Sequence, residues 1–237
     1  MRDIAALLDT LFPLGHAVAV DGSFVSGTAR TQSAPTVEVV GTTGAVAVDA
    51  ALALALAGRI LSALSGSPRP FVFLVDTSGQ ALRRHEELIG LNAYLAHLAS
   101  CVDVARRAGF RSLSIVYGEA VSGGYLSLGL MADRAYALGD AQIRVMDLKA
   151  MARVTRLPYE QIASLAKESP VFAPGAPNYA RMGALQEIWS HPSAELLDAA
   201  LRELERATSE DGRIALGHAR GGRALAEPTT AAIARAP

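Results

Sequence analysis

Three stretches of the chain join a short apolar run to a longer helical pattern. They cover residues 36–64, 71–108 and 112–132. Each apolar run is rich in β-branched or aromatic residues, as buried strands are, and the segment after it is long enough for a helix. Alternation of this kind is typical of parallel strands joined by crossover helices. The sequence therefore predicts an α/β protein.

The boundaries inside these units follow from local patterns. We expect a strand over 36–40 that stops at Gly41, and strands over 71–75 and 112–117. Alanine and leucine alternate over 51–57, which imitates a strand. Apolar residues nevertheless recur four positions apart, and alanine strongly favours helices, so we expect one helix over 45–64. It should not span a membrane, because Asp49 and Arg59 interrupt its apolar run.

The remaining segments are placed around these units. Leucines at helical spacing predict a single long helix that ends before Gly109. Five further elements are expected: a helix over 1–12, a hairpin over 17–28, two short strands over 134–146, proline-interrupted helices over 148–192 and an amphipathic helix over 193–207. The expected organisation is one domain over 1–208 and a C-terminal tail over 209–237 that is partly flexible.

Composition excludes several classes of function. The 237 residues carry a net charge of −1, so neither nucleic acid nor a membrane surface is an expected partner. The one cysteine, Cys101, excludes an internal disulfide and a cysteine metal cluster, and the five histidines show no close ligand pair. We therefore expect no metal. No signal peptide is visible, and a cytoplasmic location is expected.

The stretch 112–132 carries the first chemical motif. After the apolar run 112–117 it reads Gly118-x-x-x-Ser122-Gly123-Gly124 and continues into a helical segment. A glycine-rich turn that opens a helix leaves backbone N–H groups free and slightly positive. It can serve as an oxyanion hole or simply as a tight connection. A phosphate loop is disfavoured, because the Gly-Lys-Ser/Thr ending is missing, and the spacing also departs from G-x-S-x-G.

A second polar segment follows the neighbouring predicted strand. Residues 76–80 read Asp-Thr-Ser-Gly-Gln, and we expect them to form a loop. The carboxyl ends of parallel strands meet at one edge of a sheet, where such sheets bind ligands. The loops 76–80 and 118–123 should therefore lie together and supply two N–H donors to one oxygen.

These residues resemble a known family. VDTSGQ at 75–80, YGEAVSGG at 117–124 and the paired strands before RVM at 144–146 are similar to the crotonase and carboxyltransferase superfamily. That resemblance implies a crotonase/ClpP-like fold of stacked ββα units, with a parallel sheet, crossover helices and a helical C-terminal region. GQALRRHEELIGLN, VMDLKAMARVT and SPVFAPGAPNYARMGALQEIW resemble the gamma subunit of biotin-independent malonate decarboxylase. The resemblance covers about residues 36–190.

The family implies a reaction and a set of partners. A malonyl thioester, carried by the CoA-like phosphopantetheine arm of an acyl-carrier (delta) subunit, loses CO2 and becomes an acetyl thioester. The resemblance implies a homologous beta subunit, an acyl-carrier transferase (alpha) subunit and no tightly bound cofactor. Cleavage of the C–C bond leaves an enolate, which two N–H donors stabilise.

The resemblance also implies roles for individual residues. The oxyanion donor is carried over to Gly123, within Ser122-Gly123-Gly124, or alternatively to the N–H groups of Ala120 and Val121. Gly79 is the candidate donor in the other loop. The residues expected to line the substrate site are Ser78, Gln80, Gly118, Glu119, Ala120 and Val121. Carboxyltransferase alpha subunits usually have Gly-Gly where this chain has Ala120-Val121, which agrees with a biotin-independent enzyme.

Alternatives remain open. A ClpP-like serine hydrolase would use Ser122 as its nucleophile, but residues 141–150 lack the histidine that this family needs about 25 residues further on. A catalytically silent scaffold subunit would only complete a partner's site. Glu119 is a candidate proton donor to the carbanion if it is buried. The aromatic and Met-rich segment 169–189 is either an interface core or an internal one.

Overall fold

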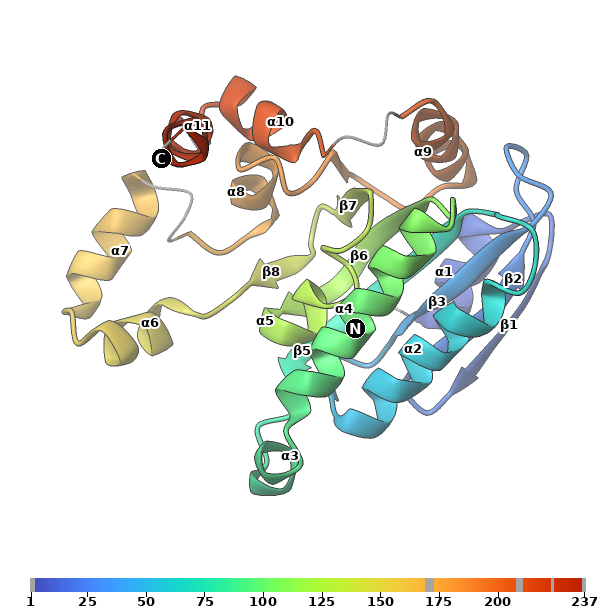
Figure 1. Cartoon of the computed structure of the whole chain (residues 1–237), viewed down its shortest axis with the longest axis horizontal. Coiled ribbons are helices and arrows are strands. Elements are labelled where there is room, and N and C mark those ends of the chain that lie inside the picture. The colour runs from blue at the N-terminus through green and yellow to red at the C-terminus, as the bar shows by residue number, and fades with distance from the viewer. Residues whose placement is uncertain (1–2, 169–172, 208–210, 223, 236–237) are drawn as a thin grey trace.

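The computed structural model describes residues 3–168, 173–207, 211–222 and 224–235. A nine-stranded sheet lies between two layers of helices (Figure 1). Its strands are β1 (His16–Asp21), β2 (Phe24–Ala29), β3 (Val37–Thr42), β4 (Val46–Val48), β5 (Phe71–Gln80), β6 (Ser112–Val121), β7 (Arg134–Leu138), β8 (Gln142–Arg144) and β9 (Glu187–Trp189).

Helices connect the strands and make up the C-terminal region. They are α1 (Ile4–Leu11), α2 (Ala50–Ala63), α3 (Arg84–Leu88), α4 (Leu91–Arg107), α5 (Ser122–Leu126), α6 (Leu148–Thr155), α7 (Tyr159–Glu168), α8 (Ala176–Arg181), α9 (Ala194–Arg206), α10 (Arg213–Ala219) and α11 (Ala226–Ala234). No helix in the described ranges is long and apolar enough to cross a bilayer.

The central strands are parallel, as predicted. The sheet runs β1-β2-β3-β5-β6-β7-β9, with the pairs β1–β2 and β2–β3 antiparallel and every later pair parallel. The two long strands β5 and β6 are direct neighbours. Each pairs by its first half with β3 or β7 and by its second half with the short strand β4 or β8. A register shift between Val75 and Thr77 marks the change from one half to the other.

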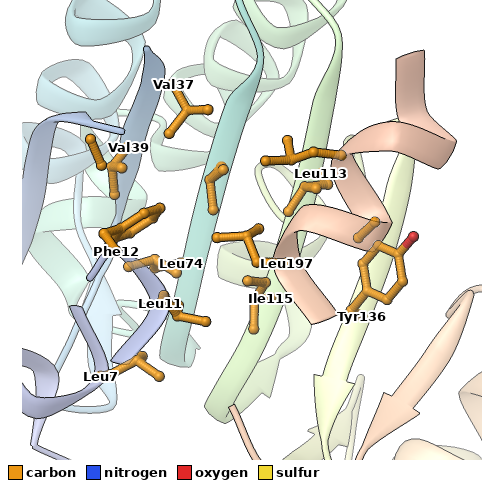
Figure 2. Packing of buried hydrophobic residues seen from close by; sticks show 14 of the residues in the cluster. Leu7, Leu11, Phe12, Val37, Val39, Leu74, Leu113, Ile115, Tyr136 and Leu197 are labelled. Carbon is orange, nitrogen blue, oxygen red and sulfur yellow. The ribbon is translucent and has the colours of Figure 1, made fainter. Parts of the chain in front are cut away.

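The two faces of the sheet have separate cores. On one face α1 and α9 pack against the strands, and Figure 2 shows Leu7 and Leu11 of α1, the adjoining Phe12, and Leu197 of α9 meeting strand residues. On the other face α2 and α4 cover the strands, with Leu56, Ile60 and Leu98 fully buried (Figure 1). Burial on both faces explains why β5 begins as a continuous apolar run, and in β6 it includes the small polar residues Ser112 and Ser114.

Three predicted strand ends are wrong, because each strand continues beyond its predicted last residue. Residues 76–80 and 118–121 are strand and not loop, because β5 and β6 continue to Gln80 and Val121 with polar residues in their second halves. The strand β3 likewise runs past Gly41. Gly41 is needed there for close packing, since a Cβ would lie 2.1 Å from the carbonyl oxygen of Leu74. A change from apolar to polar residues therefore does not mark where these strands end.

Two predicted helices are divided differently in the structure. The segment 45–64 begins as strand β4, and α2 starts at Ala50 after Asp49, whose carboxylate caps the helix by accepting from Leu52 N–H. The helix before Gly109 is broken at Gly90, which adopts the left-handed conformation between α3 and α4. Gly109 itself ends α4 with a φ of +88°, as predicted.

The region after β6 departs furthest from expectation. The helix α5 spans only five residues, and turns follow it in place of the expected long helix. The strands β7 and β8 both pair with β6 and not with each other. The short strand β9 lies within the segment that was expected to be helical.

The segment 169–189 is internal in its described part. Trp189 is buried and stacks at a tilted angle on Tyr136, with ring centroids 4.9 Å apart. Tyr179 is buried beside Tyr125. These aromatic residues therefore belong to the core and not to an exposed interface. Met182 of the same segment is partly buried, and Val171 and Phe172 lie outside the described residues.

Candidate functional site

The second halves of β5 and β6 bring the predicted site segments together. Thr77 pairs with Ala120 across the two strands. Gly79 lies against the end of β6, where an added Cβ would be 3.2 Å from the Val121 carbonyl oxygen and 3.5 Å from Ser122 Cβ. Its φ of +106° is a conformation that L side chains rarely adopt, so glycine is required. The two segments thus meet at one edge, as predicted.

Asp76 holds three segments in place. Its side chain is buried, and its two carboxylate oxygens accept hydrogen bonds from Ala45 N–H at 2.9 Å and Glu119 N–H at 2.8 Å. A Cβ at Gly118 would lie 2.3 Å from Asp76 Oδ1. Asp76 therefore joins β5 to β6 and to the β3–β4 connection, and Gly118 is a glycine because this carboxylate leaves no room beside it.

Thr77 satisfies the backbone of the first segment. Its hydroxyl donates to the Val46 carbonyl oxygen at 2.6 Å and accepts from Gly79 N–H at 3.1 Å. A Cβ at Gly124 would lie 2.7 Å from the same hydroxyl oxygen and 3.0 Å from the Gly79 carbonyl oxygen. Gly124 therefore has a packing role, and the N–H of Gly79 is engaged within the chain.

Gly123 faces the side chain of Gln80. Its N–H donates to Gln80 Oε1 at 3.0 Å, across the gap between the ends of β6 and β5. A Cβ at Gly123 would come within 3.1 Å of only two neighbours, Gln80 Oε1 and Leu95 Cδ1, which are ends of flexible side chains. The N–H of Gly123 is thus paired with an amide oxygen that a side-chain rotation can remove.

Ser122 is the first residue of α5 and follows β6 directly. Its φ is +44°, a region that a serine enters only at a cost of about 1 kcal/mol or more. No histidine hydrogen-bonds to Ser122 in the described ranges, and the three histidines with side-chain contacts meet Asp9, Cys101 and Ser190. The geometry gives no base for a serine nucleophile.

The tyrosines beside the motif are packing residues. Tyr117 and Tyr125 are both buried. The Tyr117 hydroxyl donates to the Thr42 carbonyl oxygen at 2.9 Å. Desolvation by burial raises the pKa of both phenols above the ordinary value. Neither phenol has a tendency to ionise near pH 7, and their burial gives both tyrosines a packing role.

Glu119 has a partner that sequence reasoning missed. Its Oε2 accepts from Arg144 Nη2 at 2.8 Å, and the side chains are 36% and 29% exposed. The register explains the pair, since Glu119 faces Gln142 and Val121 faces Arg144 across β6 and β8. The proton-donor hypothesis required a buried Glu119, and this carboxylate is instead ion-paired and partly exposed.

The site also depends on residues outside the two motifs, and no sequence pattern indicates that these residues lie near it. The motif residues are contacted by four residues from other elements: Thr42 of β3, Ala45 of the β3–β4 connection, Val46 of β4 and Leu95 of α4. The unpredicted strand β4 supplies Val46. Its Val-Ala-Val sequence leads almost directly into α2, so the sequence pattern predicts helix there instead of strand.

Comparison with protein families decides the identity. The profile described as malonate decarboxylase gamma subunit matches residues 41–236. The chain belongs to the malonate decarboxylase gamma subunit family. The predicted family is therefore confirmed, and the match includes both site segments and the helical C-terminal region.

Known relatives agree with this family. The malonyl-S-ACP:biotin-protein carboxyltransferase MADD of Malonomonas rubra is 33% identical over 175 residues. The alignment covers 66% of this chain and 58% of that protein, so the chain spans little more than half the length of this curated relative.

Solved structures show the same fold. A chain of a Pseudomonas malonate decarboxylase hetero-tetramer in complex with coenzyme A superposes with a TM-score of 0.79 at 23% identity, covering 95% of this chain and 97% of that one. A chain of the Pseudomonas MdcD-MdcE hetero-dimer gives 0.73 at 24% identity, covering 94% and 98%. The predicted α/β fold with a parallel sheet and a helical C-terminal region is confirmed.

Proposed function

We propose that this chain is a subunit of a malonyl-thioester decarboxylase, a carboxy-lyase that is active as part of a complex. The observation that carries the proposal is the Gly123 N–H, which points at an exchangeable carbonyl oxygen where two strand ends meet. Family membership supplies the substrate class, a malonyl group in thioester linkage. The relative from Malonomonas rubra, named for malonyl-S-ACP, supports the same class.

The decarboxylation depends more on a site that stabilises negative charge on the thioester oxygen than on a general acid or base. Breaking the bond between the malonyl carboxylate carbon and the methylene carbon releases CO2 and leaves the electron pair on the methylene carbon. That pair delocalises onto the thioester oxygen as an enolate. A proton from water or a side chain then gives the acetyl thioester. Donors aimed at the oxygen stabilise the charge as it develops, and one such donor is typically worth about 100- to 1,000-fold in rate.

Gln80 defines where the thioester oxygen would bind. Its amide oxygen is a neutral carbonyl acceptor 3.0 Å from Gly123 N, and a thioester carbonyl has the same hydrogen-bonding role. In our proposal the substrate oxygen replaces Gln80 Oε1 and the glutamine side chain rotates away. The lack of a Cβ at Gly123 lets the substrate approach the backbone.

The candidate donors differ in availability. The N–H of Gly79 is held by Thr77 Oγ1 inside the strand, so its release would disturb β5. The N–H of Gly123 is held only by a flexible side chain. We therefore assign the donor role in this chain to Gly123, with Gly79, Gly124 and Ser122 shaping the site. Ser78, Gly118, Glu119, Ala120 and Val121 would line it.

The partners follow from the family. We propose a homologous beta subunit as the direct partner, an acyl-carrier (delta) subunit that presents the thioester on its CoA-like phosphopantetheine arm, and an acyl-carrier transferase (alpha) subunit. The similar fold of a chain in the MdcD-MdcE hetero-dimer supports the pairing.

The helices α6 and α7 offer a surface for the beta subunit. They lie apart from the layer formed by α2 and α4 (Figure 1). α6 buries none of its residues, and the α6–α7 region exposes Val145, Val154, Leu157 and Tyr159. A group of exposed apolar side chains of this kind marks an interaction surface.

A scaffold role is the second candidate. It is favoured by the observation that the N–H groups of Gly79 and Gly123 both have partners within the chain. In that case the beta subunit would hold the thioester oxygen by itself. Assembled complexes with a Gly123 substitution distinguish the two functions, because only the donor role makes turnover depend on that backbone position.

A further inference from the structure

A cavity of about 520 Å³ lies at the amino-terminal edge of the parallel strands. Its walls are the segments 33–36, 67–70 and 109–111, which precede β3, β5 and β6, together with α9. Gln80 and Gly123 lie at the opposite edge. The ten residues of β5 separate the two edges by roughly 30 Å at about 3.3 Å per residue. The cavity is therefore separate from the candidate decarboxylase site.

Hydrogen bonds between elements hold this cavity open. Ser33 donates its N–H to Asp198 Oδ1 at 2.8 Å and its hydroxyl to the Asp198 carbonyl oxygen at 2.9 Å. Near the other end of α9, Arg111 Nη2 donates to the Ala207 carbonyl oxygen at 3.1 Å. The helix is thus tied to strand connections at Asp198 and just after its last residue, and a volume in the usual small-molecule range of roughly 300–1,000 Å³ is preformed.

The lining combines an apolar wall with excess positive charge. Leu201 and Leu204 of α9 and the prolines at 35, 68 and 70 supply the apolar surface. Arg69 and Arg111 also line the cavity, together with one acidic residue, Glu205. The buried Glu38 pairs with both Arg59 and Arg69. The net charge of the group is therefore +1, from the arginines at 59, 69 and 111 and the glutamates at 38 and 205.

We propose that this cavity binds a small organic anion, with a carboxylate or phosphate group on a short aliphatic body. Guanidinium groups recognise both kinds of anion through paired N–H donors. The leucines and prolines would cover the aliphatic body and shield it from water. A cation would meet Arg69 and Arg111, and a neutral alcohol would gain only the apolar contact. The proposal does not depend on the decarboxylase assignment.

The test is a titration of the full-length chain, followed through the NMR signals of the Leu201 and Leu204 methyl groups. The probes are hexanoate, hexyl phosphate, hexanol and hexylamine. Both leucines should shift with the two anions, while Leu126, near the candidate site, should not. The neutral and cationic probes should bind at least about tenfold more weakly. Comparison of hexanoate with hexyl phosphate shows which anionic group is preferred.

Two substitutions at exposed lining positions sharpen the test. Ser67→Trp should fill the cavity and weaken hexanoate binding at least about tenfold, whereas Ser65→Trp, two residues away and outside the lining, should not. Glu205→Gln removes the acidic lining charge and should tighten binding about two- to threefold. The proposal is overturned if hexanol binds as tightly as hexanoate, if neither anion binds at about 10 mM, or if Glu205→Gln weakens binding.

Discussion

The backbone N–H of Gly123 donates a 3.0 Å hydrogen bond to the side-chain oxygen of Gln80. This contact joins the end of β6 to the end of β5 and fills the position that the thioester oxygen takes in our proposal. Gln80 would then compete with the substrate, and its removal should ease binding.

Replacement of Gln80 by methionine tests that competition. Methionine keeps the length of the side chain but offers no carbonyl acceptor. A typical net hydrogen bond is worth about 1 kcal/mol, so the KM for malonyl thioester in the assembled complex should fall about fivefold while kcat stays unchanged. Gln142→Met on β8 is the matched control, since Gln142 is exposed. A raised KM in Gln80→Met would mean that Gln80 binds the substrate and does not compete with it.

Ser122 should be dispensable for chemistry. It has no histidine partner among the described residues, so Ser122→Ala should keep at least about a tenth of the decarboxylation rate, and a fluorophosphonate probe should not label the chain. Labelling at Ser122 in one-to-one stoichiometry, measured by mass spectrometry, would revive the hydrolase alternative.

Asp76 should be important for stability. Asp76→Ala leaves the N–H groups of Ala45 and Glu119 without their acceptor. A buried donor that loses its partner costs about 1–3 kcal/mol, so the free energy of unfolding should fall by about 2–4 kcal/mol in urea titrations. Asp21→Ala in the exposed hairpin serves as the control and should change it by less than about 0.5 kcal/mol. Equal effects of the two substitutions would contradict the role of Asp76.

Much of this site could be predicted from the sequence. The glycine motifs and the alternation of strands and helices were sufficient to place Gly79 and Gly123 at one edge of a parallel sheet. The position of β4 was not predictable, because Val46–Val48 runs directly into an alanine-rich helix and has no turn signal of its own. The pairing of Glu119 with Arg144 depends on the register between β6 and β8. The sequences of such short strands do not fix this register by themselves, because the rest of the fold sets it.

The sequence also could not predict which of the motif glycines has a backbone N–H that a substrate can reach. The residues Gly118, Gly123 and Gly124 look alike in a motif, yet their surroundings differ. A Cβ at Gly118 would meet the Asp76 carboxylate and a Cβ at Gly124 would meet Thr77 and the Gly79 backbone, whereas Gly123 meets only movable side-chain ends. Packing requires the first two glycines, and only the third leaves its N–H accessible through a side-chain rotation.

The chain should need its partner for turnover. The isolated chain should release CO2 from malonyl thioester at the background rate and become active when the beta subunit is added. Val154 of α6 is 67% exposed, and Val154→Asp should weaken the pairing at least about tenfold by placing a charge in an apolar contact. Val104→Asp on α4, at a site 47% exposed, is the matched control and should pair normally. Sedimentation measures the pairing, and robust turnover by the monomeric chain would contradict the dependence on a partner.

The most direct test of the donor role is the rate of CO2 release by a complex that contains Gly123→Val. The valine side chain should push Gln80 and Leu95 aside and block the approach to the backbone N–H, while the complex still assembles. The account predicts a loss of at least about 100-fold in kcat/KM for malonyl thioester. Full activity in a Gly123→Val complex of normal size would contradict the donor role and leave this chain as a scaffold for its partner.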